Sequence, residues 1–185
     1  NPLDTITSGL ASICRFPKGV TVENNVKSGA ILVQLFDVET SRECRIVRER
    51  ISELDLVVRA VIPAAPNSRV FSVATYEHAL PIGTEIPRLV VQDEAGREVV
   101  KVGQAEIISY LDETFSMSDA PDAESDNLKE SVLNVAHAVG NYAACFLRLG
   151  RGSSVTSAAL SAATPRPDLP LILYSYEGNQ FCRLV

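Results

Sequence analysis

The sequence predicts an α/β domain, in which short strands alternate with amphipathic helices. Residues 31–54 carry the clearest signal, because a strand-like apolar run (ILVQLF) leads through a polar turn into a charged segment with apolar residues at helical spacing. Residues 56–62 form a second apolar run, and residues 86–102 contain two more β-prone runs separated by a turn. Strands that alternate with helical segments are typical of the α/β class.

The same strand-to-helix stretch occurs twice in the chain. The C-terminal sequence PLILYSYEGNQFCRLV (170–185) aligns with residues 32–47 at one constant offset. That offset pairs Cys44 with Cys182 and also Glu39 with Glu177. The repeat predicts a tandem architecture, in which the second copy stops just after its helix begins.

The element pattern divides the chain into four parts. Residues 1–30 are expected to form a short helix and a connector, and residues 31–115 a complete domain with the order β-α-β-α-β-β-α. Residues 116–169 are expected to hold an acidic linker, a helix of small residues and a Ser/Ala/Pro-rich linker. Residues 170–185 are the expected start of the second copy.

The first helix and the strand after it have local signals of their own. Residues 42–54 carry apolar side chains at helical spacing. The expected buried face consists of Ile46, Val47, Ile51 and Leu54. Residues 56–62 are so rich in apolar residues that this strand is expected to be covered on both faces.

The second half of the domain is less regular. Residues 69–80 are ambiguous, because a β-prone start stands where the order calls for a short helix. A strand led by Pro87 and a hairpin partner at 97–102 follow. A helix at 103–115 then closes the unit. Its expected buried residues are Ile107, Ile108 and Leu111.

The helix expected at about 127–149 has two interpretations. Its section from 131 to 147 carries no charge, which would suit a membrane span, although 17 residues is at the short end for crossing a bilayer. The polar side chains of Asn134, His137 and Asn141 favour a helix packed against protein instead. Any membrane contact is therefore expected to be peripheral.

Composition excludes several classes of protein. With 46% hydrophobic and 22% charged residues the chain has an ordinary globular composition. A net charge of −6 argues against a nucleic-acid binder, which needs a basic face to neutralise phosphates. The four cysteines are far apart in the sequence and form no C-x-x-C pair, so a structural zinc site is not expected.

The most distinctive chemical group is the cysteine at the start of the predicted helix. Cys44 lies in the first turn, where unpaired backbone N–H groups favour a thiolate. Arg42 and Arg45 act in the same direction, and Glu43 opposes them. One interpretation is a reactive monothiol. The other is a small buried residue beneath the helix, since free cysteine is among the most buried residue types.

Taken together, these features resemble a known family. The element order, the thiol on the first helix and the proline that opens the third strand are similar to the thioredoxin-like fold, and more narrowly to the N-terminal domain of glutathione S-transferases. The segments that carry the resemblance are LVQLFDVETSRECRIVRERISELDLVVRAVI, IPRLVVQDEAG and GQAEIISYLDETF. Two such domains in tandem are similar to thioredoxin-like proteins of cyanobacteria and plastids.

The resemblance implies a degenerate redox motif in both copies. The first cysteine position of the family motif corresponds to Ser41, and in the second copy to Asn179. Only the second cysteine is present, as Cys44 and Cys182. A dithiol cycle needs an attacking and a resolving sulfur, so neither copy can form the internal disulfide of the motif. Ser41 is then either a hydroxyl that hydrogen-bonds a thiolate or a helix N-cap.

The resemblance also implies a degenerate glutathione site. Pro87 matches the family proline that is usually cis and that leaves the backbone of Ile86 free to pair with a cysteinyl peptide. Gly103 and Gln104 stand where the family has a Glu-Ser pair for the γ-glutamyl group. The carboxylate is thus lost, although helix N–H groups remain available to an anion. Gln104 is a remnant ligand contact or a plain cap of the helix.

Two functions follow from the resemblance. One is a binding or structural module, a peripheral subunit of a thylakoid-associated plastid complex, with a protein partner and no required cofactor. The other is a glutathione-dependent thiol transferase that works through Cys44 or Ser41. The losses fall on the positions that thiol chemistry needs, so the first function is favoured.

Overall fold

A computed structural model of the 185-residue chain describes residues 31–93, 96–116, 153–161 and 172–174, and the single residues Ile6 and Val22. The expected N-terminal helix, the acidic linker and the helix at about 127–149 lie outside the described residues.

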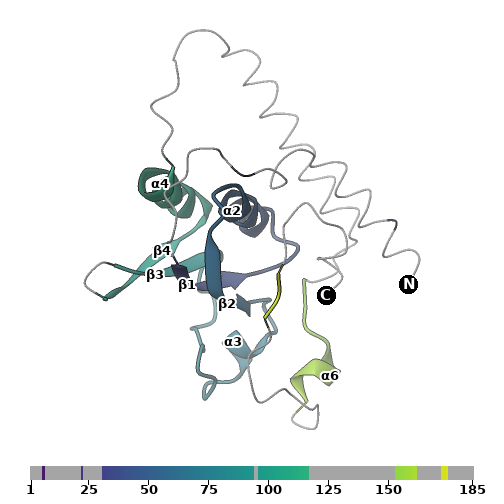
Figure 1. Cartoon of the computed structure of the whole chain (residues 1–185). Coiled ribbons are helices and arrows are strands. Elements are labelled where there is room, and N and C mark those ends of the chain that lie inside the picture. The colour runs from purple at the N-terminus through teal and green to yellow at the C-terminus, as the bar shows by residue number, and fades with distance from the viewer. Residues whose placement is uncertain are drawn as a thin grey trace.

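The described domain is a four-stranded mixed sheet with helices on both faces (Figure 1). Its elements are β1 (Ile31–Asp37), α2 (Arg42–Glu53), β2 (Val57–Pro63), α3 (Arg69–Ser72), β3 (Arg88–Gln92), β4 (Glu98–Val102) and α4 (Gln104–Phe115), with α6 (Ser157–Leu160) further along the chain. The predicted order β-α-β-α-β-β-α is confirmed. The ambiguous stretch at 69–80 begins as the short helix α3 and continues as a loop.

The sheet has the strand order β2-β1-β3-β4. β1 and β2 are parallel, whereas β3 is antiparallel to both β1 and β4. In this register Phe36 pairs with Ile62 and with Arg88, and Arg88 pairs with Val102. The ends of β1, β2 and β4 and the start of β3 therefore meet at one edge of the sheet.

We call this edge the carboxyl edge. It consists of the loops at 38–41 and 63–68, the Ile86–Pro87 pair, and Gly103 with Gln104. All the site positions predicted in the first copy, apart from Cys44 in the first turn of α2, belong to it.

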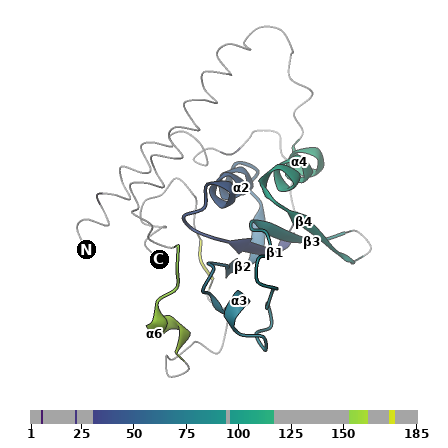
Figure 2. The same ribbon diagram turned by 180° about the vertical axis from the view of Figure 1, so that it is seen from behind.

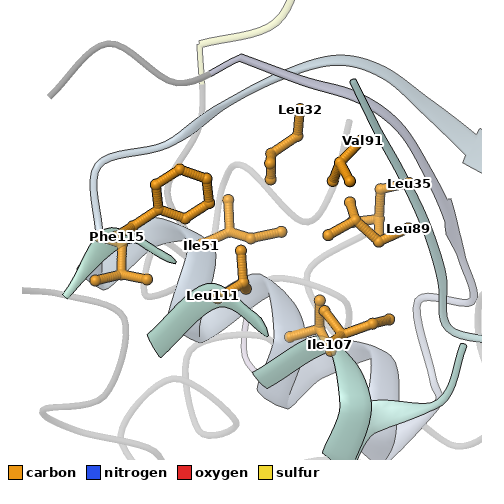
Figure 3. Close-up of a cluster of buried hydrophobic side chains, with 10 residues drawn as sticks. Leu32, Leu35, Ile51, Leu89, Val91, Ile107, Leu111 and Phe115 are labelled. Atoms are coloured by element: carbon orange, nitrogen blue, oxygen red, sulfur yellow. The ribbon is translucent and has the colours of Figure 1, made fainter. Parts of the chain in front are cut away.

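The main core lies between the sheet and the two long helices. α2 and α4 lie side by side over one face, and α3 lies on the opposite face (Figure 1). The buried cluster comes from the strands β1 and β3 and from both long helices (Figure 3), and consists of Leu32, Leu35, Val47, Ile51, Leu54, Leu89, Val91, Ile107, Leu111 and Phe115. Of the predicted helix faces, Ile46 and Ile108 are only partly buried. Each fully buried side chain of this size contributes about 1.5–3 kcal/mol.

The helix α2 ends in a capping motif at its C-terminus. Asp55 adopts a φ of +48°, and its N–H donates to the carbonyl of Ser52 at 3.2 Å. The N–H of Leu56 donates to the carbonyl of Ile51 at 3.0 Å. This pair of bonds satisfies the last carbonyls of the helix and turns the chain into β2.

The expectation that β2 is covered on both faces is wrong. Val57 is 63% exposed and Val61 is 55% exposed. β2 lies at the edge of the sheet, so the helices that pack over the central strands cover it only in part. Apolar composition alone does not distinguish an edge strand from a central one.

The described part of the second copy is short. Ile172, Leu173 and Tyr174 belong to no strand and are exposed. The rest of residues 170–185, with Asn179 and Cys182, lies outside the described residues, so the second domain stays a prediction.

Candidate functional site

Cys44 lies at the centre of the candidate site, and it is buried. It is the third residue of α2, it is free of any disulfide, and none of its surface is exposed. Its Sγ accepts a hydrogen bond from the N–H of Val38 at 3.4 Å. The interpretation as a buried residue beneath the helix is confirmed.

Burial also decides the protonation of this thiol. The pKa of Cys44 is raised to about 11, mainly by loss of hydration and then by the nearby Asp37 carboxylate, while two hydrogen bonds and the charge of Arg48 act in the opposite direction. The expectation that the helix N-terminus, Arg42 and Arg45 would favour the thiolate is wrong here. A thiolate inside the protein loses more hydration energy than these groups return.

The raised pKa predicts a loss of stability at alkaline pH. Cys44 holds its proton longer in the folded protein than in the unfolded chain, so its contribution is complete below pH 9 and is lost as the pH rises towards 11. Between pH 8 and 10, wild type should therefore lose more stability than Cys44→Ala, measured as the midpoint of urea unfolding. Parallel loss in both proteins would show that this thiol is not the cause.

Ser41 is the N-cap of α2. Its Oγ accepts a hydrogen bond from the N–H of Cys44 at 3.2 Å and donates one to Oε2 of Glu43 at 2.9 Å. A hydrogen bond from the backbone N–H of Glu43, and then one from the Ser41 hydroxyl, hold the pKa of Glu43 below its ordinary value. The N-cap interpretation is confirmed, and the hydroxyl proton is already committed to a carboxylate.

Removing this cap should cost measurable stability. Ser41→Ala leaves an N–H group of the first turn without its acceptor and is expected to destabilise the domain by about 1 kcal/mol. Ser41→Asn keeps an acceptor oxygen at the cap and should restore most of the loss. Urea unfolding of the three proteins gives the comparison, and equal stability of the alanine and asparagine variants would contradict the capping role.

Arg48 holds the loop that precedes the cap. Its Nη1 lies 2.5 and 2.7 Å from the two carboxylate oxygens of Asp37. Its Nη2 donates to the backbone carbonyl of Glu39 at 3.2 Å and lies 3.3 Å from the carboxylate of the same residue. Glu39 thus helps to hold the strand-to-helix loop through Arg48. The corresponding Glu177 lies outside the described residues.

Pro87 has the expected geometry. The Ile86–Pro87 peptide bond is cis, and Pro87 is buried while Ile86 is half-buried. The carbonyl of Pro87 accepts a hydrogen bond from the N–H of Gly103 at 2.9 Å. This contact joins the start of β3 to the start of α4 at the carboxyl edge.

The structure shows why residue 103 is a glycine, which sequence reasoning missed. It is the N-cap of α4, with a φ of +78°, and a Cβ atom at this position would lie 2.7 Å from Oε1 of Glu85. Glycine is favoured by its backbone conformation and by the close carboxylate. Because Gly103 is the cap, Gln104 is the first residue of the helix. Glu85, two residues before the cis proline, therefore lies beside the N-terminus of α4, where no sequence pattern had suggested a carboxylate.

The carboxyl edge brings most of the predicted site together, but not as a reactive centre. In residues 31–116 with their short gap, no group of three His, Cys, Asp or Glu side chains could hold a metal ion. None of the described helices is long and apolar enough to cross a membrane. The edge and the residues next to it therefore offer the buried thiol of Cys44, the Ser41 hydroxyl used as a cap, the cis proline Pro87 and the exposed carboxylate of Glu85.

The chain matches no protein-family model, no curated protein and no solved structure. The class that the coordinates define is an α/β domain with a mixed four-stranded sheet. Function must therefore be argued from the site itself.

Proposed function

We propose that residues 31–115 form a thioredoxin-like module of the glutathione S-transferase N-terminal type, which binds a protein partner and does not carry out thiol chemistry. The sheet order β2-β1-β3-β4, the parallel β1–β2 pair and the cis peptide before β3 support the fold assignment. Of these, the cis peptide is a feature that the resemblance implies for such a domain.

The observation that carries the functional proposal is the state of Cys44. Thiol transfer requires a thiolate that a disulfide sulfur can approach. Cys44 has no exposed surface and its pKa is raised to about 11, so at neutral pH it is a covered thiol. Ser41 occupies the other motif position and is used as the helix cap. Both motif positions thus serve the stability of the domain.

The proposed partner is a protein, and the resemblance supplies its setting. We propose a peripheral subunit of a thylakoid-associated plastid complex that requires no cofactor. Apolar side chains remain exposed on the edge strand β2 and in the loop before β3, where Ile82 is 88% exposed. We infer that the partner contacts the domain at these positions.

A second candidate, a glutathione-linked thiol transferase, is favoured by one observation. The carboxylate of Glu85 lies beside Gly103 at the start of α4, close to where the resemblance implies a carboxylate for the ammonium group of glutathione. Glu85 would then replace the lost acidic residue, with Cys44 or Ser41 as the reacting group.

Calorimetric titration of reduced and oxidised glutathione into the full chain distinguishes these functions. The proposed module should give no heat up to millimolar concentrations. Micromolar binding, about −8 kcal/mol, that weakens in Cys44→Ser would instead establish the thiol-transferase function. Glu85→Gln tests the carboxylate separately, because it keeps the shape of the side chain and removes its charge.

Native fractionation tests the partner. The module should migrate with a large complex in extracts of its source, and Ile82→Asp should release it if the exposed loop takes part. A protein that runs as a free monomer in those extracts, before and after crosslinking, would overturn the proposal.

A further inference from the structure

A side chain of the carboxyl edge binds the backbone of a distant segment. Asn67 lies in the loop between β2 and α3, and Val155 lies 88 residues further along the chain. Nδ2 of Asn67 donates a hydrogen bond to the carbonyl of Val155 at 2.7 Å. The N–H of Val155 donates to Oδ1 of Asn67 at 2.8 Å. One amide side chain thus satisfies both backbone groups of one residue.

This pairing depends on the backbone of Val155 and not on its side chain. A neighbouring β-strand offers the same donor and acceptor to a residue in extended conformation. Among side chains of this length only asparagine supplies a donor and an acceptor together, since aspartate lacks the donor. The contact of Asn67 therefore does not depend on which side chain stands at position 155.

The loop that carries Asn67 is held firmly. The N–H of Ser68 donates to the carbonyl of Ala65 at 2.8 Å, which closes a turn around Pro66 and Asn67. Ala65 and Ser68 are 5% and 3% exposed, whereas Asn67 itself is exposed. The N–H of Ala64 donates to the carbonyl of Asp37 at 2.7 Å and ties the loop to the end of β1. The exposed Asn67 amide thus projects from a loop whose backbone is held in place by hydrogen bonds.

The segment that Asn67 holds has little structure of its own. The N–H groups of Ala159 and Leu160 reach back to Thr156 at 3.4 and 3.3 Å, which makes α6 a single turn. An isolated single turn is not stable in water. α6 lies on the same side of the sheet as α3 in both views (Figure 1, Figure 2). Its position therefore depends on contacts with the domain, and the Asn67 amide supplies two of them.

We propose that residues 153–161 are a latch, which Asn67 holds closed through its two hydrogen bonds to the backbone of Val155. Both bonds are exposed to water, and a net hydrogen bond of this kind changes an equilibrium by a factor of about 2–10. In its open form the Asn67 amide is free to pair with the extended backbone of a partner, at the edge where Pro87 and Ser41 also lie.

Hydrogen exchange of the full chain tests the latch. Asn67→Ala should raise the exchange rates of the Val155, Ala159 and Leu160 amides about three- to tenfold and leave the β1 and β2 amides unchanged. Gln92→Ala is the matched control, because it removes another exposed amide-to-backbone bond, that of Nε2 to the carbonyl of Gly96. The control should leave residues 153–161 unchanged.

A second variant approaches the contact from the other side. Val155→Pro removes the N–H that donates to Oδ1 of Asn67. It should raise the exchange rates of the Ala159 and Leu160 amides without affecting the loop at 63–68. Wild-type rates at residues 159 and 160 in both variants would overturn the proposal. So would an equal rise in the β2 amides of Asn67→Ala, because the variant would then have loosened the domain and not the latch. Neither result depends on glutathione or on a partner.

Discussion

Replacing Leu111 by alanine should destabilise the domain by about 2–5 kcal/mol. Leu111 has no exposed surface and points from α4 into the cluster between the two long helices and the sheet (Figure 3). Truncation removes apolar contacts and leaves a cavity, because neighbours on α2 and β3 can relax only in part. Urea unfolding followed by circular dichroism measures the difference.

The matched control is Ile82→Ala. It also truncates a large aliphatic side chain, but Ile82 is 88% exposed in a loop, so its effect should stay within about 0.5 kcal/mol. Similar losses in the two variants would mean that α4 does not pack on the sheet as described. The strands and helices would then follow one another in the described order but would not share the described core.

Replacing Arg48 by methionine should cost about 2–3 kcal/mol. The change keeps an unbranched apolar stem but leaves the Asp37 carboxylate, which is 9% exposed, without its cation. Breaking a buried pair from one side costs about 3–5 kcal/mol, and the partial exposure of both side chains lowers that figure. Urea unfolding at neutral pH measures the loss.

Two comparisons make this prediction specific. Arg97→Met breaks the pair with Asp93 on the surface, where Arg97 is 79% exposed, and should change stability by less than about 0.5 kcal/mol. Adding Asp37→Asn to Arg48→Met removes the stranded charge and should recover part of the loss. If the double variant is less stable than Arg48→Met alone, the cost does not come from an unpaired carboxylate.

Local signals in the sequence were sufficient for the element order and for much of the helix geometry. The apolar spacing at 42–54 predicted α2, and Ser41 had the side chain of an N-cap. These two features arise within a few residues of the chain, so periodicity and capping chemistry determine them. The cis peptide before Pro87 was instead implied by the family resemblance, and it is present.

The behaviour of the candidate site was decided by tertiary structure. The helix-terminus argument for Cys44 considered only neighbours in sequence, whereas the pKa is raised mainly by the protein packed around the sulfur. The pairing of Arg48 with Asp37, the closeness of Glu85 to Gly103 and the exposure of β2 depend in the same way on what folds against each group.

The sequence by itself thus predicted the order of the strands and helices within residues 31–115, and the positions of a thiol, a helix cap and a proline along the chain. Only the tertiary structure decided that the thiol is covered, that Gly103 is required at its turn and that Asn67 holds Val155 across 88 residues. The physical reason is the range of the interactions. Hydrogen bonding within a helix and alternation along a strand are local, whereas desolvation and long-range contacts exist only once distant parts of the chain have packed together.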